Sequence, residues 1–135
     1  MSVLLDTGIV YAYYDRSDRW HAKARTFIQG ERRGLILPAA VVPEVDHLLG
    51  RRLGAASRQT FYAGIVDGYY LIADLPGQAY ARVAELNRQF EALDVGFVDA
   101  AIVALTETLG VSRIATTDRR HFEPIAAALS LQILP

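Results

Sequence analysis

The sequence predicts an α/β fold, a three-layer α/β/α sandwich in which helices cover both faces of a central, mostly parallel sheet. Two observations support this prediction. Short apolar runs alternate with segments of helical spacing along the chain, a pattern that is typical of a parallel sheet with helices on both sides. The runs Val3–Leu5 and Leu35–Leu37 are also continuously apolar, as expected of strands that are buried on both faces.

Composition limits both the architecture and the chemistry. A chain of 135 residues, of which 52% are hydrophobic, is expected to form a single domain (residues 1–135) around one core. The absence of cysteine excludes disulfides, thiolate catalysis and cysteine-based zinc sites. The N-terminus does not resemble a signal peptide, and no apolar stretch approaches the roughly 20 residues that cross a bilayer. We therefore expect a soluble, cytoplasmic protein without a membrane span.

The first half of the chain is expected to contain three strands and four helices. Asp6 directly follows the first strand and precedes a helix, for which it is a potential cap. Asp18 is a potential N-cap of the next helix, and Pro43 fits the first turn of another helix, which places Glu44 near its start. The remaining expected elements are a helix at His21–Gln29, a strand at Leu35–Leu37, a helix at Ala55–Val66 and a strand at Tyr69–Ala73.

The second half continues the alternation. Pro76 is expected to open a helix, and Gly110 to end a second helix that carries Asp99 in its first turns. The apolar face of this second helix comprises Phe97, Val98, Ala101, Ile102, Leu105 and Leu109. The expected elements after it are a strand at Val111–Thr116 followed by Asp118, a short helix at Pro124–Leu129 and an edge strand at Leu131–Leu134.

Four acids fall at strand ends or helix starts on one predicted edge of the sheet, where ligand crevices form in open α/β sheets. They are Asp6, Glu44, Asp99 and Asp118. Two of them also have a purely structural interpretation. Asp6 could serve merely as a helix cap, and Glu44 could serve merely to complement a helix dipole. Each acid alone is weak evidence, and the prediction depends on their common location.

Four carboxylates in one partly dry crevice cannot all stay ionised unless a cation joins them. An all-oxygen site without cysteine or paired histidines favours a hard ion such as Mg²⁺ or Mn²⁺, and an open site of this kind suits phosphate chemistry. Thr7, Thr116 and Thr117 offer hydroxyl groups near the same rim, where they could support the acids or contact phosphate.

The motifs resemble those of the PIN domain, in particular the VapC-type toxins of bacterial toxin–antitoxin pairs, over essentially the whole chain. The matching segments are LLDTGIVYAYYD, DRWHAKA, VVPEVDHLLGRR, GFVDAAIVALTETLG and IATTDRRHF. The resemblance implies a Mg²⁺- or Mn²⁺-dependent endoribonuclease that acts as a homodimer and is blocked by the tail of an antitoxin protein.

The resemblance also implies residue roles. Asp6, Asp99 and Asp118 would bind the metal directly, whereas Glu44 would bind it directly or through water and would help to orient the nucleophile. Thr116 occupies a position where the family often carries a supporting hydroxyl. Two further acids, Asp46 and Asp94, are expected to lie outside the metal site.

Alternative functions remain open. The chain could be a PIN ribonuclease of RNA processing that is not a toxin, or a non-catalytic PIN-like interaction module. A phosphatase that forms an aspartyl-phosphate at Asp6 is a third alternative, but such an enzyme would have an acid where this chain has Gly8. A receiver domain would have a lysine late in the sequence, and the only lysine here is Lys23.

The net charge of −1 gives no global attraction for RNA, so local side chains would have to supply it. The paired arginines are either solvated surface residues or phosphate contacts, and Arg119 and Arg120 have the stronger case because they adjoin Asp118. Aromatic residues could stack on unpaired bases, although packing against helices or an antitoxin is the favoured interpretation; these residues are Tyr11, Tyr13, Tyr14 and Trp20.

Overall fold

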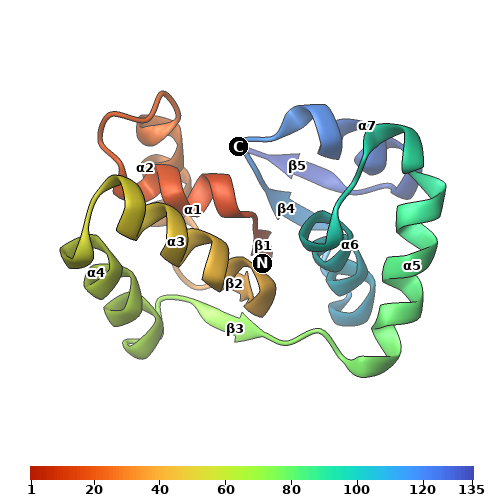
Figure 1. Cartoon of the computed structure of the whole chain (residues 1–135), viewed down its shortest axis with the longest axis horizontal. Coiled ribbons are helices and arrows are strands. Elements are labelled where there is room, and N and C mark those ends of the chain that lie inside the picture. The colour runs from red at the N-terminus through yellow and green to blue at the C-terminus, as the bar shows by residue number, and fades with distance from the viewer.

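The computed structural model describes residues 1–135 and contains one five-stranded sheet with the order β3-β2-β1-β4-β5. Every neighbouring pair of strands is parallel. The strands are β1 (Val3–Leu5), β2 (Leu35–Pro38), β3 (Leu71–Ala73), β4 (Arg113–Ala115) and β5 (Gln132–Leu134). Helices pack on both faces of this sheet (Figure 1). The α/β/α sandwich predicted from the sequence is therefore confirmed.

Seven α-helices connect and cover the strands. They are α1 (Thr7–Tyr14), α2 (His21–Gly30), α3 (Val42–Arg52), α4 (Ala55–Val66), α5 (Tyr80–Gln89), α6 (Phe97–Leu109) and α7 (Arg119–Leu129). In Figure 1, α1 to α4 lie on one side of the central strand β1, and α5 to α7 lie on the other. None of these helices combines the length and apolar character that a membrane span requires.

The core is centred on β1, whose three residues are fully buried between β2 and β4. The register pairs Leu4 with Ile36 of β2 and with Ile114 of β4. This placement explains why the β1 sequence is apolar at every position rather than at alternate positions. The residue that follows β1 emerges at the middle of the sheet edge, with strands on both sides.

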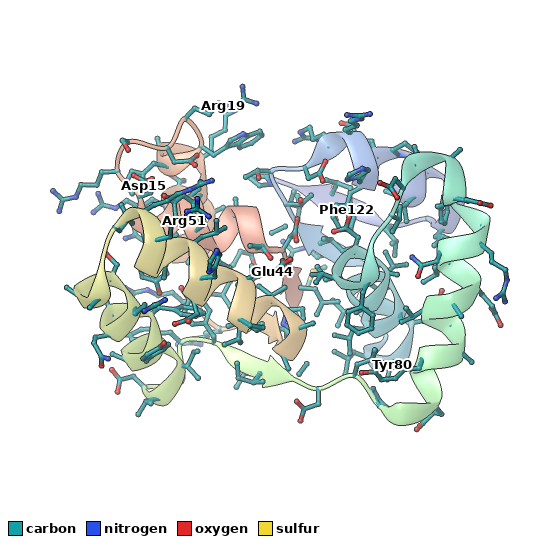
Figure 2. The ribbon with its side chains drawn as sticks, in the orientation of Figure 1. Asp15, Arg19, Glu44, Arg51, Tyr80 and Phe122 are labelled. Atoms are coloured by element: carbon teal, nitrogen blue, oxygen red, sulfur yellow. The ribbon has the colours of Figure 1, made fainter.

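Helix α7 differs from the sequence expectation. The presence of Pro124 suggested a helix start, but the helix begins at Arg119 and Pro124 lies in its interior. Phe122 is fully buried and fixes the first turn of α7 against the core (Figure 2). The start of this helix is therefore held in place close to Asp118.

Three smaller expectations were also wrong. Asp18 does not cap α2, because the N-cap residue is Trp20; the Asp18 side chain instead accepts a hydrogen bond from the Trp20 backbone at 2.8 Å. Phe97 and Leu109 belong to the predicted apolar face of α6, yet they are 44% and 43% exposed. Tyr69 and Tyr70 precede β3 rather than belonging to it.

Candidate active site

Two of the predicted acids lie at the ends of adjacent central strands and cap the helices that follow. Asp6 comes directly after β1 and is the N-cap of α1, where its Oδ1 accepts a hydrogen bond from the Thr7 backbone at 2.8 Å. Asp118 follows β4 and is the N-cap of α7. Since β1 and β4 are parallel neighbours, both carboxylates emerge at the same edge of the sheet. Capping and site formation are thus compatible roles.

The other two acids come from the first turns of helices. Glu44 lies in the first turn of α3 and Asp99 in the first turn of α6. All four carboxylates are therefore located at helix N-termini, where the helix dipole favours negative charge. Figure 2 shows Glu44 near the middle of the molecule, between the helices of the two halves of the chain.

Thr116 holds Asp6 and the Asp118 backbone together. Its hydroxyl donates to Asp6 Oδ2 at 2.7 Å and accepts a hydrogen bond from the Asp118 backbone N–H at 2.9 Å. The side chain is fully buried, and Asp6 is only 7% exposed. Thr116 therefore fixes the distance between the two strand ends.

Thr7 supports Glu44 in a similar way, because its hydroxyl donates to Glu44 Oε1 at 2.5 Å. This contact joins the start of α1 to the start of α3. The neighbouring Gly8 packs so closely on Thr117 that a Cβ at this position would lie 2.3 Å from the Thr117 hydroxyl oxygen. An acidic side chain at position 8, as an aspartyl-phosphate enzyme would require, would force the Thr117 hydroxyl to move.

The crevice destabilises negative charge. Burial is the main cause that raises the pKa of Asp6 from 3.8 to about 6, with Asp118 and Glu44 adding repulsion. Burial also raises the pKa of Asp99 from 3.8 to about 7, and here the charges of Asp6 and Asp118 contribute further. The four acids thus interact electrostatically as one group.

Neither lysine nor arginine forms a salt bridge with any of these four acids. A cluster of carboxylates whose charges repel one another, with oxygen donors and without a lysine or arginine partner, fits a hard divalent ion such as Mg²⁺ or Mn²⁺. The donor set is therefore consistent with the metal expected from the sequence.

The structure adds His121 to the site, a residue that the sequence prediction did not include. Its Nδ1 lies 2.8 Å from Asp118 Oδ2 and 3.7 Å from Asp99 Oδ2. The sequence did contain a signal for this contact. His121 follows Asp118 by three residues, and in a helix capped by Asp118 this spacing brings the two side chains together. That signal was missed because α7 was expected to begin only at Pro124.

The acids that were expected outside the site lie elsewhere. Asp46 forms a salt bridge with Arg58 at 3.3 Å and accepts a hydrogen bond from Tyr62. Asp94 ends a 3-10 turn before α6, with a left-handed backbone at φ 53°. Neither residue contributes to the electrostatic group around Asp6 and Asp99.

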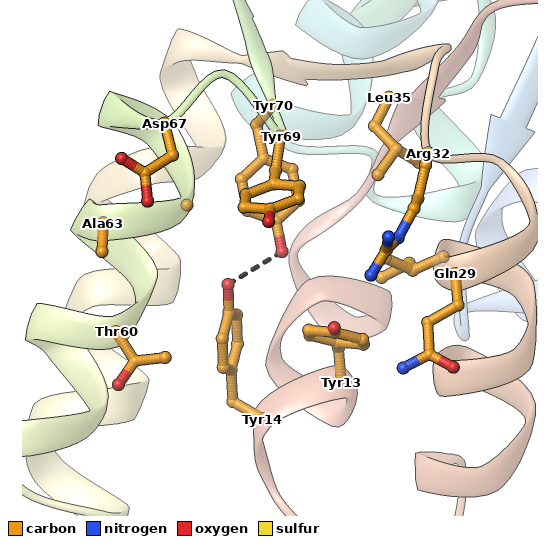
Figure 3. A pocket seen from close by; sticks show the side chains of 12 residues that line it. Tyr13, Tyr14, Gln29, Arg32, Leu35, Thr60, Ala63, Asp67, Tyr69 and Tyr70 are labelled. Carbon is orange, nitrogen blue, oxygen red and sulfur yellow. Dashed lines mark hydrogen bonds between the residues drawn. The ribbon is translucent and has the colours of Figure 1, made fainter.

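A separate cavity of about 310 Å³ lies between α1, α2 and α4 and contains none of the four acids (Figure 3). Tyr14 and Tyr70 meet there through a hydrogen bond of 2.8 Å between their hydroxyl groups. Burial raises the pKa of Tyr14 to about 12, so this hydroxyl stays protonated. Tyr14 also packs edge-on against Phe61, which agrees with a packing role rather than base stacking.

The arginines near the site are not equivalent. Arg119 contacts Glu123 at 3.2 Å and the carbonyl oxygen of Pro135 at 2.5 Å, and Arg52 lies over the ring of Tyr11. Arg51 is exposed on α3, seven residues after Glu44. Seven residues are about two helical turns, so Arg51 and Glu44 share a face of α3.

The PIN domain family model matches residues 3–127, which is most of the chain. The chain belongs to the PIN domain family. The resemblance inferred from the sequence motifs is thereby confirmed.

Relatives with known names agree with this assignment. This PIN domain is 26% identical to Ribonuclease VapC26 of Mycobacterium tuberculosis over 123 residues, which is 91% of each chain. Its fold is similar to the crystal structure of VapC20 from Mycobacterium tuberculosis, a toxin that cleaves the sarcin–ricin loop, with a TM-score of 0.82, 18% identity and coverage of 99% and 100%.

Two further solved structures share the fold. One is a toxin–antitoxin complex from Klebsiella pneumoniae, with a TM-score of 0.74, 16% identity and coverage of 99% of this chain and 97% of that one. The other is FitAcB from Neisseria gonorrhoeae, with a TM-score of 0.70, 15% identity and coverage of 98% and 96%.

Proposed function

We propose that this PIN domain is a Mg²⁺- or Mn²⁺-dependent endoribonuclease that hydrolyses phosphodiester bonds and acts as the toxin of a toxin–antitoxin pair. The observation that carries the proposal is the convergence of Asp6, Glu44, Asp99 and Asp118 at one sheet edge, without a lysine or arginine partner. The named relatives, a ribonuclease and structures of toxins, support the same reaction.

The four acids would have different roles in the site, according to their environments. Asp99 and Asp118 would bind the cation directly, and so would Asp6, whose orientation is fixed by Thr116 and by the Thr7 backbone. When bound, a divalent cation activates water for attack and neutralises the charge that develops on the phosphate. The protein raises the pKa of Asp6 and Asp99, so a bound cation would favour their ionised forms, which are the forms that bind a cation well.

Glu44 is suited to handle a proton at the edge of the site. It is exposed, and the Thr7 hydroxyl holds its Oε1, while Oε2 has no hydrogen-bond partner in the protein. Oε2 would therefore accept a hydrogen bond from the attacking water and orient it toward the phosphorus atom, whether Glu44 also contacts the cation or not. The Thr7 hydroxyl keeps the carboxylate of Glu44 in this position.

RNA would approach along the exposed face of α3. Arg51 is exposed and shares a face of α3 with Glu44, so its guanidinium group would contact a backbone phosphate of the bound RNA. Together with the bound cation, this positive charge would offset the net charge of −1 and the four carboxylates. The attraction for RNA would therefore come from positive charge at the site and not from the net charge of the protein.

We also propose that the protein forms a homodimer and binds an antitoxin. Tyr80 and Phe97 expose 53% and 44% of their surface, and their ring centroids lie 5.7 Å apart, so together they form an apolar surface that a second copy would cover. Antitoxin binding is proposed because the similar fold from Klebsiella pneumoniae was solved as a toxin–antitoxin complex. Co-purification with the product of the neighbouring reading frame tests the antitoxin.

Cleavage of total RNA by the purified protein, free of antitoxin, tests the reaction. Mg²⁺ and Mn²⁺ should give discrete fragments, whereas EDTA or Asp99→Asn should abolish cleavage; the exposed Asp74→Asn variant is the matched control and should remain active. Cleavage that persists in EDTA, or in a folded Asp99→Asn protein, would refute the proposed site. Growth arrest upon expression in bacteria, lost in Asp99→Asn, tests the toxin role.

A further inference from the structure

His121 is located where it could contribute directly to the metal site. It is the third residue of α7, and its side chain is 28% exposed. Its backbone N–H donates to Asp118 Oδ1 at 3.2 Å, while its Nδ1 lies 2.8 Å from Asp118 Oδ2. Both carboxylate oxygens of Asp118 therefore contact the same histidine, and the buried Phe122 next to it keeps the turn in place.

Three potential ligand atoms converge at this point. One carboxylate oxygen each of Asp99 and Asp118 and one ring nitrogen of His121 all lie within 4.8 Å of one another. Adjacent ligands of a six-coordinate ion with metal–ligand distances of about 2.1 Å lie about 3 Å apart. The three side chains would have to move closer together to reach that separation, and all three are partly exposed rather than enclosed by the core.

We propose that His121 Nδ1 is a direct ligand of the catalytic cation, next to Asp99 and Asp118. This inference rests on the proposed metal-dependent function and goes beyond its all-oxygen donor set. It adds a nitrogen donor to a site that the sequence had predicted to contain only oxygen ligands.

The surroundings of the imidazole ring favour this role. Nδ1 faces both carboxylates, whereas Nε2 forms no hydrogen bond with the protein. Without a cation, Nδ1–H donates to the Asp118 carboxylate; a bound cation would take the place of this proton, with the neutral ring then carrying its hydrogen on Nε2. A cation placed among these three atoms replaces the contact between Nδ1 and Asp118 that exists in its absence.

A nitrogen ligand changes which metal the site prefers. Mg²⁺ favours carboxylate and water oxygens, whereas imidazole suits transition metals. His121 is therefore expected to strengthen binding of Mn²⁺ much more than binding of Mg²⁺. If His121 only positioned Asp118 by a hydrogen bond, its removal would instead weaken the binding of both ions to a similar extent.

Electron spin-echo spectroscopy of bound Mn²⁺ tests the proposal without measuring activity, because a coordinated nitrogen nucleus gives a resolved coupling. The chain has three histidines, so the nitrogen can be assigned by substitution. We expect the coupling in the wild-type protein and in His47→Gln, a change at an exposed position of α3, and its loss in His121→Gln. His21 is already engaged through its Nδ1, 2.8 Å from the carbonyl oxygen of Ala12.

Calorimetry on the same variants supplies the second readout. His121→Gln should lose about tenfold or more in Mn²⁺ affinity while its Mg²⁺ affinity changes by less than about threefold. Circular dichroism establishes that the variant is folded, and His121→Asn offers a second substitution if it is not. Mn²⁺ binding without nitrogen coupling, or equal losses for both ions, would overturn the His121 assignment and leave the proposed function intact. Absence of any Mn²⁺ or Mg²⁺ binding by the wild-type protein would overturn both.

Discussion

Replacing Asp99 by asparagine is expected to stabilise the metal-free protein while abolishing metal binding. The pKa of Asp99 rises from 3.8 to about 7 on folding, mainly through burial and then through repulsion by Asp6 and Asp118. The folded state therefore binds this proton more tightly than the unfolded chain does. The resulting contribution to stability is fully present below pH 3.8 and is lost as the pH rises through about 7.

The size of the effect follows from the same pKa values. A rise from 3.8 to about 7 corresponds to at most about 4 kcal/mol at pH 8. The side chain of Asp99 is 20% exposed, so water screens part of this repulsion. We expect Asp99→Asn to raise the free energy of unfolding by about 1–2 kcal/mol at pH 8, which is about 4–8 °C in melting temperature. At pH 4 the gain should nearly vanish.

Thermal unfolding in EDTA at pH 4, 6 and 8 measures this gain, with the exposed Asp74→Asn variant as control. Addition of Mg²⁺ or Mn²⁺ should then raise the melting temperature of the wild-type protein but not that of Asp99→Asn. A variant that is less stable than the wild type at pH 8, or a gain that is equal at pH 4 and pH 8, would refute the electrostatic reasoning. Such a result would mean that Asp99 is paired with a cationic group in the absence of metal.

Three further predictions concern other parts of the molecule. Thr116→Val should lower the free energy of unfolding by about 1–3 kcal/mol and weaken metal binding, because it removes the donor to Asp6 and the acceptor for the Asp118 backbone N–H. Chemical denaturation measures the loss of stability, and calorimetry measures the loss of metal affinity. Arg51→Glu should weaken RNA binding and reduce its salt dependence, as measured by fluorescence anisotropy with an uncleavable RNA, whereas Arg88→Glu on α5 should not. Phe97→Glu should convert the proposed dimer into a monomer in light scattering, and a dimer that persists would place the interface elsewhere.

The parts of the site that follow from local sequence could be predicted. Asp6 and Asp118 directly follow short apolar strands, and parallel strands end at a common edge, so their proximity needed no tertiary information. Asp99 and Glu44 were placed by helix-start signals such as Pro43. The edge of the sheet on which the acids meet is therefore encoded by the order of strands, acids and helices along the chain.

Other features depend on contacts that spacing does not reveal. The hydrogen bond from Thr7 to Glu44 exists because α3 packs against α1. Phe97 remains 44% exposed although its ring lies 5.7 Å from that of Tyr80, which the spacing of α6 alone does not reveal. His121 was missed for a different reason. Pro124 is a strong helix-start signal, but the buried side chain of Phe122 stabilises an earlier turn, so packing prevailed over the local signal.

The central position of β1 has a consequence for how the protein is made. Asp6 is synthesised 110 residues before its partner Thr116, and its strand is bordered by β4, which comes late in the chain. At ribosomal speeds of 5–20 residues per second, this separation corresponds to about 5–20 s. Throughout that interval the nascent chain holds Asp6 without Asp118, so the cluster is incomplete. For the proposed endoribonuclease this order of synthesis has a consequence: the acidic cluster cannot form, and RNA near the ribosome cannot be cleaved, before β4 and Asp118 have been translated.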